Sequence, residues 1–258
     1  KGNLSMTQEI VLTFLRWLHV VAGIFWLGVG YTLLFALLPA LSGLATDVRQ
    51  AIASTVQRRM FTFLRWGSLL AWFTGIVLLG MVFHGGGRMF DDTAAGWNAA
   101  AGISVLAVFL AFAVYDVLAK MSFFADIRRL GALAFLATIA LVEIMSGPAG
   151  MGYSAVLIHI GTLFGTIMVA NVWMRIWPAQ RAAIAAQQEG RPADEPRLQE
   201  ATRRTRHNAY ISVPLLWTML GQHSVVPGAF SNVWFYGVIV ASWGLVAYLE
   251  ARSRRHAW

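Results

Sequence analysis

Residues 16–30 read RWLHVVAGIFWLGVG, and this stretch decides the fold of the chain. It belongs to an apolar run that is long enough to cross a bilayer, yet it carries Arg16 and His19 three residues apart. An ionisable group inside a membrane helix is costly and is usually kept for function. Gly23 and Gly30 share a helical face with these two side chains. We therefore expect a membrane helix whose polar face packs inward, around a bound group that requires an imidazole.

The composition predicts an all-α integral membrane protein. Of the 258 residues, 58% are hydrophobic and only 12% are charged. Apolar runs near the length of about 20 residues that crosses the hydrocarbon core recur along the chain. Helices suit such runs because they satisfy their own backbone groups in lipid. The net charge of +8 comes from basic residues in short loops between the apolar runs. Topology explains this charge better than phosphate binding, so we expect no nucleic-acid partner.

Seven transmembrane helices are expected in a single domain that covers residues 1–258, with a polar cytoplasmic loop at 179–206 whose first part could extend the fifth helix as an amphipathic stalk. Pro39 and Pro178 are expected to end the first and fifth helices, and Pro214 to kink the sixth. The first run is too long for a cleaved signal peptide, and Met6 is expected to be the natural start. The expected helices lie at about 10–38, 61–83, 97–119, 131–146, 153–177, 208–222 and 232–249.

The distribution of basic residues predicts the orientation. Placing the connections that follow the first, third and fifth expected helices in the cytoplasm, together with the C-terminus, puts 17 lysines and arginines inside and leaves three outside. Positive residues favour the cytoplasmic side. The N-terminus is therefore expected outside and the C-terminus inside. The chain is expected to be a multi-pass protein of a cytoplasmic membrane.

Four histidines are expected near the outer ends of their helices. They are His19, His84, His159 and His223. The chain has no cysteine, which excludes disulfides, thiolate metal sites, iron–sulfur clusters and covalent attachment of c-type haem. Several imidazoles at one depth without thiolates point to one or two haems b or, as a less favoured alternative, to copper. We expect these four histidines to be haem-iron ligands.

Each of these features also has a purely structural explanation. His19 could donate a hydrogen bond to a carbonyl one turn back, and His223 could cap a helix. Gly161 and Gly165, which follow His159, could admit a haem or serve ordinary helix packing.

Two charged residues complete the expected site. Glu143 lies one turn before the outer end of the fourth expected helix, at the depth of Arg16. An arginine there suits a haem propionate or an anionic substrate, and a carboxylate suits proton transfer. A structural ion pair between the two is the alternative. We predict catalytic roles for Glu143 and Arg16.

Several segments resemble the membrane-embedded N-terminal domain of the bacterial cytochrome-c-linked urate oxidase family. They occur in the same order and cover most of the chain. They are RWLHVVAGIFWLG at 16–28, VYDVL at 114–118, HIGT at 159–162, ANVWMRIWPAQ at 170–180, RHNAYISVPLL at 206–216 and the later His223.

The resemblance implies an oxidoreductase that passes electrons from a small substrate to cytochrome c, with its site facing the periplasm. Family members carry a C-terminal cytochrome c domain, whereas this sequence stops at Trp258 without cysteine. We therefore expect the cytochrome c, or another redox subunit, to be a separate chain.

Two other functional classes are consistent with the same residues. One is a non-catalytic haem-binding subunit for electron transfer or anchoring in a larger respiratory complex. The other is a copper or small-solute transporter that uses the same histidines. A transporter would need polar residues between the outer histidines and the cytoplasmic face, but the helices there are mostly aliphatic and aromatic. We therefore favour the enzyme.

Overall fold

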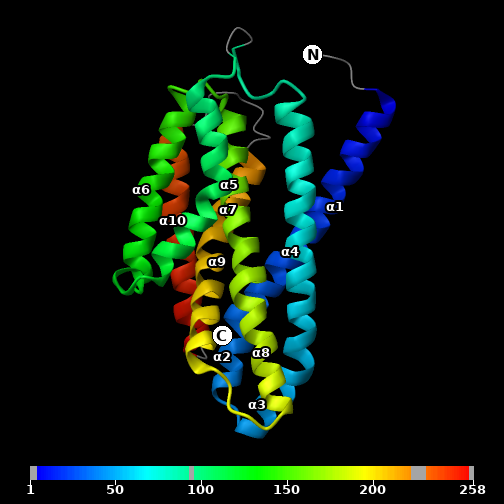
Figure 1. Ribbon diagram of the computed structural model, residues 1–258, viewed down its shortest axis with the longest axis vertical. Helices are drawn as coiled ribbons and strands as arrows, with labels where there is room; N and C mark the ends of the chain where they lie inside the picture. Colours follow the sequence, from blue (N-terminus) through cyan, green and yellow to red (C-terminus); the bar gives the residue numbers. More distant parts are fainter. Residues whose placement is uncertain (1–4, 93–95, 222–230, 256–258) are drawn as a thin grey trace. The chain divides into compact units, whose positions relative to one another are not determined.

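The computed structural model describes residues 5–92, 96–221 and 231–255, and these residues form helices joined by short connections (Figure 1). Seven long helical stretches occur among them, as expected, and none of these residues forms a strand. The elements are α1 (Met6–Tyr31), η1 (Thr32–Leu37), α2 (Leu38–Ser42), α3 (Thr46–Ile52), η2 (Ala53–Gln57), α4 (Arg58–Leu79), η3 (Gly80–His84), α5 (Ala99–Lys120), η4 (Ser122–Phe124), α6 (Ile127–Ser146), α7 (Tyr153–Asn171), η5 (Val172–Ile176), α8 (Trp177–Gln188), α9 (Glu195–Gly221) and α10 (Asn232–Arg254).

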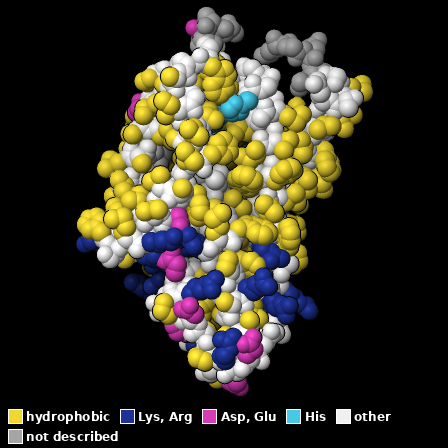
Figure 2. All heavy atoms as spheres, in the orientation of Figure 1, with side chains coloured by type: hydrophobic (Ala, Val, Ile, Leu, Met, Phe, Trp, Pro, Cys, Tyr) yellow, Lys and Arg dark blue, Asp and Glu magenta, His cyan; other side chains and the backbone are white. Residues whose placement is uncertain are grey.

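Six of the helical stretches are long and apolar enough to cross a membrane. Large hydrophobic side chains such as Phe14, Trp17 and Ile24 of α1 are exposed, as lipid-facing side chains would be. The seventh stretch, α9, differs because its first half carries most of its charged residues. Figure 2 shows hydrophobic side chains over much of the visible face and many of the charged ones over α8 and the first half of α9.

Two helices continue through prolines that were expected to end them. Pro39 and Pro178 both lie in the first turn of the α-helical segment that follows them, α2 and α8. A π-helical segment, η1 or η5, directly precedes each proline-containing turn. Its wider turn gives the proline ring room that a regular α-helix denies it. The first helix therefore ends at Ser42, and the segment 179–206, predicted as a loop, is helical except at 189–194.

The chain divides into two compact units. Unit 1 comprises Lys1–Leu78, Val169–Ala209 and Leu245–Trp258, and unit 2 comprises Leu79–Met168 and Tyr210–Gly244. Each unit gathers segments that are far apart in the sequence. The expectation of a single domain stays a prediction, and each unit is described by itself below.

Unit 1 contains a close approach between α1 and α4. A Cβ atom added at Gly67 would lie 3.3 Å from both the Ala22 carbonyl oxygen and the Trp26 nitrogen. Trp26 and Leu64 are buried in this contact region. The absence of a side chain at Gly67 lets the two backbones approach, which is how membrane helices commonly pack.

Unit 2 contains a close approach between α7 and α9. A Cβ atom added at Gly161 would lie 2.4 Å from Thr218 Oγ1 and 2.7 Å from Met219 Cε. One turn later, Gly165 has no atom within 4 Å of its added Cβ position. Gly161 therefore allows α7 to pack closely against α9, which is the structural explanation given above. This contact lies two residues after His159 in the same helix.

Candidate functional site

A glycine-rich helix end positions His84 in unit 2. The π-helical η3 ends at His84, and Gly85, Gly86 and Gly87 follow. A Cβ atom added at Gly86 would lie 2.4 Å from the Val82 carbonyl oxygen, and Gly87 has a φ of 69°. Side chains are disfavoured at both positions, because one would clash and the other is in the left-handed region. The glycines thus allow the chain to turn immediately after the imidazole.

His84 meets His159 of α7, which lies 75 positions later in the sequence. Their Nε2 atoms are 3.1 Å apart. His159 is fully buried, whereas His84 is partly exposed and stacks on Trp97 with ring centroids 5.5 Å apart. Phe90 packs edge-on against the same tryptophan. The two predicted ligands therefore face each other in an aromatic setting.

The hydrogen bonds of His159 determine which ring nitrogen carries its proton. His159 Nδ1 lies 2.7 Å from the Ala155 carbonyl oxygen. A carbonyl only accepts, so Nδ1 donates and Nε2 keeps its lone pair. His84 Nε2–H then donates to His159 Nε2. A ring held by one nitrogen through a backbone carbonyl, with the other nitrogen open, is the usual arrangement of a metal-binding histidine.

His19 is held in the same way in unit 1. Its Nδ1 donates to the Ala71 carbonyl oxygen at 2.8 Å and lies 3.1 Å from Thr74 Oγ1. The acceptor is on the neighbouring α4 rather than one turn back in α1. Gly75 makes room for the ring, because a Cβ atom there would lie 3.0 Å from His19 Cε1. Helix α4 thus fixes the ring through Nδ1 and leaves the Nε2 edge for another partner.

Glu143 of α6 has hydrogen-bond partners that sequence reasoning missed. Tyr236 Oη donates to its carboxylate at 2.6 Å, and Asn232 Nδ2 donates at 3.3 Å. Asn232 Nδ2 also donates to Ser146 Oγ at 3.2 Å. Tyr236 and Asn232 are four residues apart in the first turns of α10, a spacing that places them on one helix face. Only this spacing in the sequence pointed to them as a pair.

Within the described residues, no hydrogen bond or ion pair joins Arg16 or Glu143 to the histidine pair. Arg16 is exposed on α1 in unit 1, and Glu143 belongs to unit 2, so their predicted catalytic roles stay predictions. His223 lies outside the described residues. Within residues 5–92, 96–221 and 231–255, no three histidine or acidic side chains gather in a way that could hold a metal ion. The ligand set that these residues offer is therefore a pair of imidazoles.

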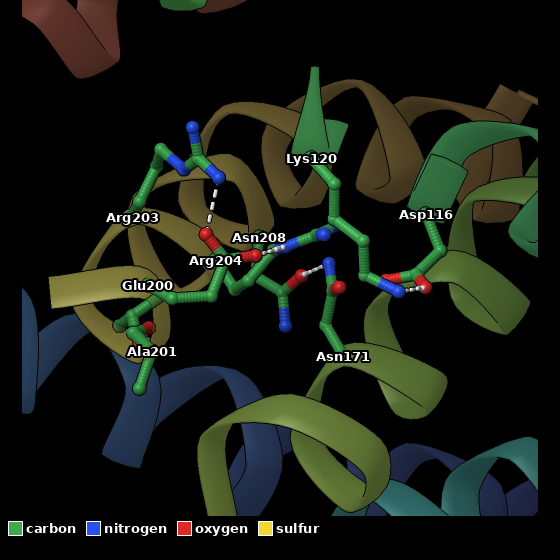
Figure 3. Close-up of polar contacts among 9 residues, drawn as sticks. Asp116, Lys120, Asn171, Glu200, Ala201, Arg203, Arg204 and Asn208 are labelled. Atoms are coloured by element: carbon green, nitrogen blue, oxygen red, sulfur yellow. Dashed lines mark hydrogen bonds and ion pairs between the residues drawn. The ribbon is translucent and has the colours of Figure 1, made fainter. Parts of the chain in front are cut away.

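A second polar cluster in unit 1 surrounds Glu200 of α9. Glu200 forms ion pairs with Arg203 and Arg204, the latter at 2.6 Å (Figure 3). Arg204 is fully buried. Burial raises the pKa of the Glu200 carboxyl, but hydrogen bonds and charge from Arg204 and Arg203 outweigh burial and lower its pKa overall. Glu200 therefore stays ionised and compensates a buried cation.

The same cluster extends to neighbouring side chains of unit 1. Asn171 Nδ2 donates to Asn208 Oδ1 at 2.8 Å, a contact visible in Figure 3. His207 is buried, and burial together with the charge of Arg204 lowers its pKa to about 3. On α10, Glu250 pairs with Arg206 at 2.6 Å. These contacts join the end of α7, α9 and α10 within the unit, so we interpret the cluster as structural.

Comparison with known proteins gives one result. A family model described as urate oxidase N-terminal matches residues 42–256. No curated protein and no solved structure matches the chain. The matched range includes His84, Glu143, His159 and His223, and it begins after Arg16 and His19.

Proposed function

Since the chain belongs to the urate oxidase N-terminal family, we propose that it is a haem-b-binding membrane oxidoreductase. In this proposal it passes electrons from a small reduced substrate to a separate cytochrome c. The observation that carries the proposal is the facing pair His84 and His159, whose Nε2 atoms are 3.1 Å apart.

The donor set suits a haem better than a bare metal ion. A haem supplies four of its own iron ligands and needs one or two from the protein. The described residues offer two facing imidazoles and no group of three histidine or acidic side chains, which favours a haem over a metal ion held by such side chains alone. His159 would hold the iron through Nε2, because its Nδ1 is engaged with Ala155. A bound haem would supply a redox centre that takes up and releases one electron at a time.

His84 is the second ligand in this proposal. The Nε2 atoms of His84 and His159 contact each other directly at 3.1 Å, so one ring would have to move aside for both to hold a haem. His84 is the side chain that can move, because it is partly exposed and precedes three glycines, whereas His159 is buried.

The remaining residues have roles that follow from their chemistry. Glu143 would accept the substrate proton, with Tyr236 and Asn232 orienting its carboxylate. Arg16 would bind an anionic group, either a propionate or the substrate. His19, oriented by Ala71, is the candidate ligand for a second haem, and His223 is a further candidate.

The proposed location is the bacterial inner membrane, with the N-terminus and the site on the periplasmic side and the C-terminus in the cytoplasm. The excess of 17 basic residues over three supports this orientation. The six long apolar helices support the membrane location.

A difference spectrum tests the cofactor. The full chain is purified in detergent, and its dithionite-reduced minus oxidised spectrum is recorded with a pyridine haemochrome assay. We expect a b-type signal that is lost in His159→Ala and weakened or shifted in His84→Ala. His207→Ala is the matched control, because His207 is also buried but belongs to the structural cluster. A colourless wild-type protein, or equal loss in the control, would contradict the proposal.

A second assay separates the enzyme from an electron-transfer subunit. Urate is added to the haem-loaded protein together with cytochrome c, and reduction of the cytochrome is followed. Substrate-dependent reduction supports the enzyme. A haem signal without such reduction by urate or related purines would instead support the accessory subunit.

A further inference from the structure

A groove on unit 1 combines an apolar floor with two arginines. Its volume is about 320 Å³. It lies on α8 and the start of α9, and its lining residues are Trp177, Pro178, Arg181, Ala182, Ala185 and Arg197. No acidic residue is among them. The residues of the groove belong to unit 1, whereas the histidine pair belongs to unit 2.

The two arginines of the groove differ from the other arginines of this region. Arg203 and Arg204 pair with Glu200, and Arg191 pairs with Glu189. Arg181 and Arg197 are exposed, and their guanidinium groups have no ion pair or hydrogen bond with any side chain in the described parts of the chain. Two uncompensated cations beside an apolar surface attract a ligand that carries an anionic head and an apolar tail.

The floor of the groove joins an aromatic cluster. The Arg65 guanidinium lies 4.4 Å from the ring centroid of Trp177, 5.1 Å from that of Trp66 and 5.4 Å from that of Trp173. Trp173 Nε1 also donates to the Arg65 carbonyl oxygen at 3.2 Å. Tryptophans gather where a membrane meets water, because their rings suit both environments. The cluster therefore indicates that the groove lies at the level of lipid head groups.

The length of the helix supports the same depth. The helical stretch Tyr153–Gln188 has 36 residues. At about 1.5 Å per residue it is about 54 Å long, which exceeds a hydrocarbon core of about 30 Å. Its first residues are strongly apolar, so its C-terminal part, which carries Trp177 and Arg181, extends beyond the hydrocarbon.

We propose that this groove binds an anionic phospholipid. Arg181 and Arg197 hold the phosphate of the head group, and the upper part of an acyl chain lies against Trp177, Ala182 and Ala185. Basic pockets at the cytoplasmic ends of membrane helices suit anionic head groups because charge and apolar contact act together. The proposal requires that the chain is embedded in a membrane, but it does not require haem.

A lipid titration tests the proposal. The detergent-purified full chain is titrated with dioctanoyl phosphatidylglycerol, and the thermal unfolding midpoint is recorded at each concentration, since a ligand that binds the folded state stabilises it. We expect a saturating rise with this lipid and none with dioctanoyl phosphatidylcholine. An arginine near an anionic lipid surface contributes about 1 kcal/mol, or about fivefold in affinity. Arg181→Gln/Arg197→Gln should therefore weaken apparent binding about 25-fold.

Matched controls separate the groove from general surface charge. Arg58→Gln/Arg59→Gln removes the same charge from exposed positions of α4 in the same unit and should leave binding unchanged. Equal weakening in this control would overturn the proposal. So would equal stabilisation by phosphatidylcholine, or an equal effect of inorganic phosphate, which would identify a free-phosphate site. The haem spectrum of the groove variant should stay that of wild type, so failure here is distinct from failure of the proposed function.

Discussion

Gly161 and Gly165 of α7 offer a sharp test of how the helix that carries His159 is packed. The two glycines are one turn apart, but their surroundings differ. An alanine Cβ at 161 would lie 2.4 Å from Thr218 Oγ1 and 3.2 Å from Thr218 Cβ, whereas one at 165 would have no atom within 4 Å. Thr218 is fully buried, and its hydroxyl donates to the Leu215 carbonyl oxygen at 2.7 Å, so it cannot simply turn away.

The magnitude follows from two opposing effects. Overpacking costs about 1–3 kcal/mol. Replacing glycine by alanine inside a helix contributes about 1 kcal/mol in the other direction. Gly161→Ala should therefore be destabilising by about 1 kcal/mol net, and Gly165→Ala should be stabilising by up to about 1 kcal/mol. The difference of about 2 kcal/mol corresponds to about 4–8 °C in melting temperature for a chain of this size.

Thermal unfolding of both variants in detergent measures this difference. The double variant Gly161→Ala/Thr218→Ala removes the nearest atom and should recover most of the lost stability, which a double-mutant cycle would quantify. If Gly161→Ala and Gly165→Ala have the same midpoint, or if Thr218→Ala gives no recovery, the close packing of α7 on α9 would be refuted.

Three further predictions concern charged and titratable groups. Glu200→Gln removes the carboxylate that pairs with the buried Arg204 and should lower the free energy of unfolding by about 2 kcal/mol. The exposed Glu189→Gln should have no measurable effect. Chemical unfolding of both variants compares them, and equal effects would contradict the buried ion pair. Burial and the charge of Arg204 lower the pKa of His207 in the folded protein from its ordinary value of 6.5 to about 3. Between pH 3 and 6.5 the unfolded state therefore binds more protons than the folded state, so stability should fall as pH drops below about 6.5, by at most about 1.4 kcal/mol per pH unit. From pH 7 to 4, the unfolding midpoint should depend less steeply on pH in His207→Gln than in the wild type. An unchanged pH dependence would contradict the lowered pKa of His207. Under the proposed function, Tyr236→Phe removes the hydroxyl that donates to Glu143 and should slow substrate-dependent cytochrome c reduction about tenfold. The haem spectrum should stay unchanged. Loss of haem would instead indicate a structural role for Tyr236.

Local properties of the sequence determined the class of the protein. Apolar runs and the scarcity of charge predicted seven helices, and seven long helical stretches occur among the described residues. The quoted motifs predicted the family that the model match over residues 42–256 confirms. The same local reasoning misjudged Pro39 and Pro178, because a π-helical turn before each proline lets the helix continue. Whether such a turn forms is not visible in the proline alone.

Contacts between distant segments were decided only by the tertiary structure. His84 and His159 were both candidates, but their direct pairing across 75 positions depends on how η3 and α7 pack in unit 2. In the same way, the Ala71 carbonyl that orients His19 belongs to another helix. Gly161 and Gly165 look equivalent in sequence, yet only at Gly161 would an added Cβ atom meet a neighbouring helix within 4 Å. Hydropathy and spacing show which side chains share a face, whereas the partner of that face depends on the three-dimensional packing of helices.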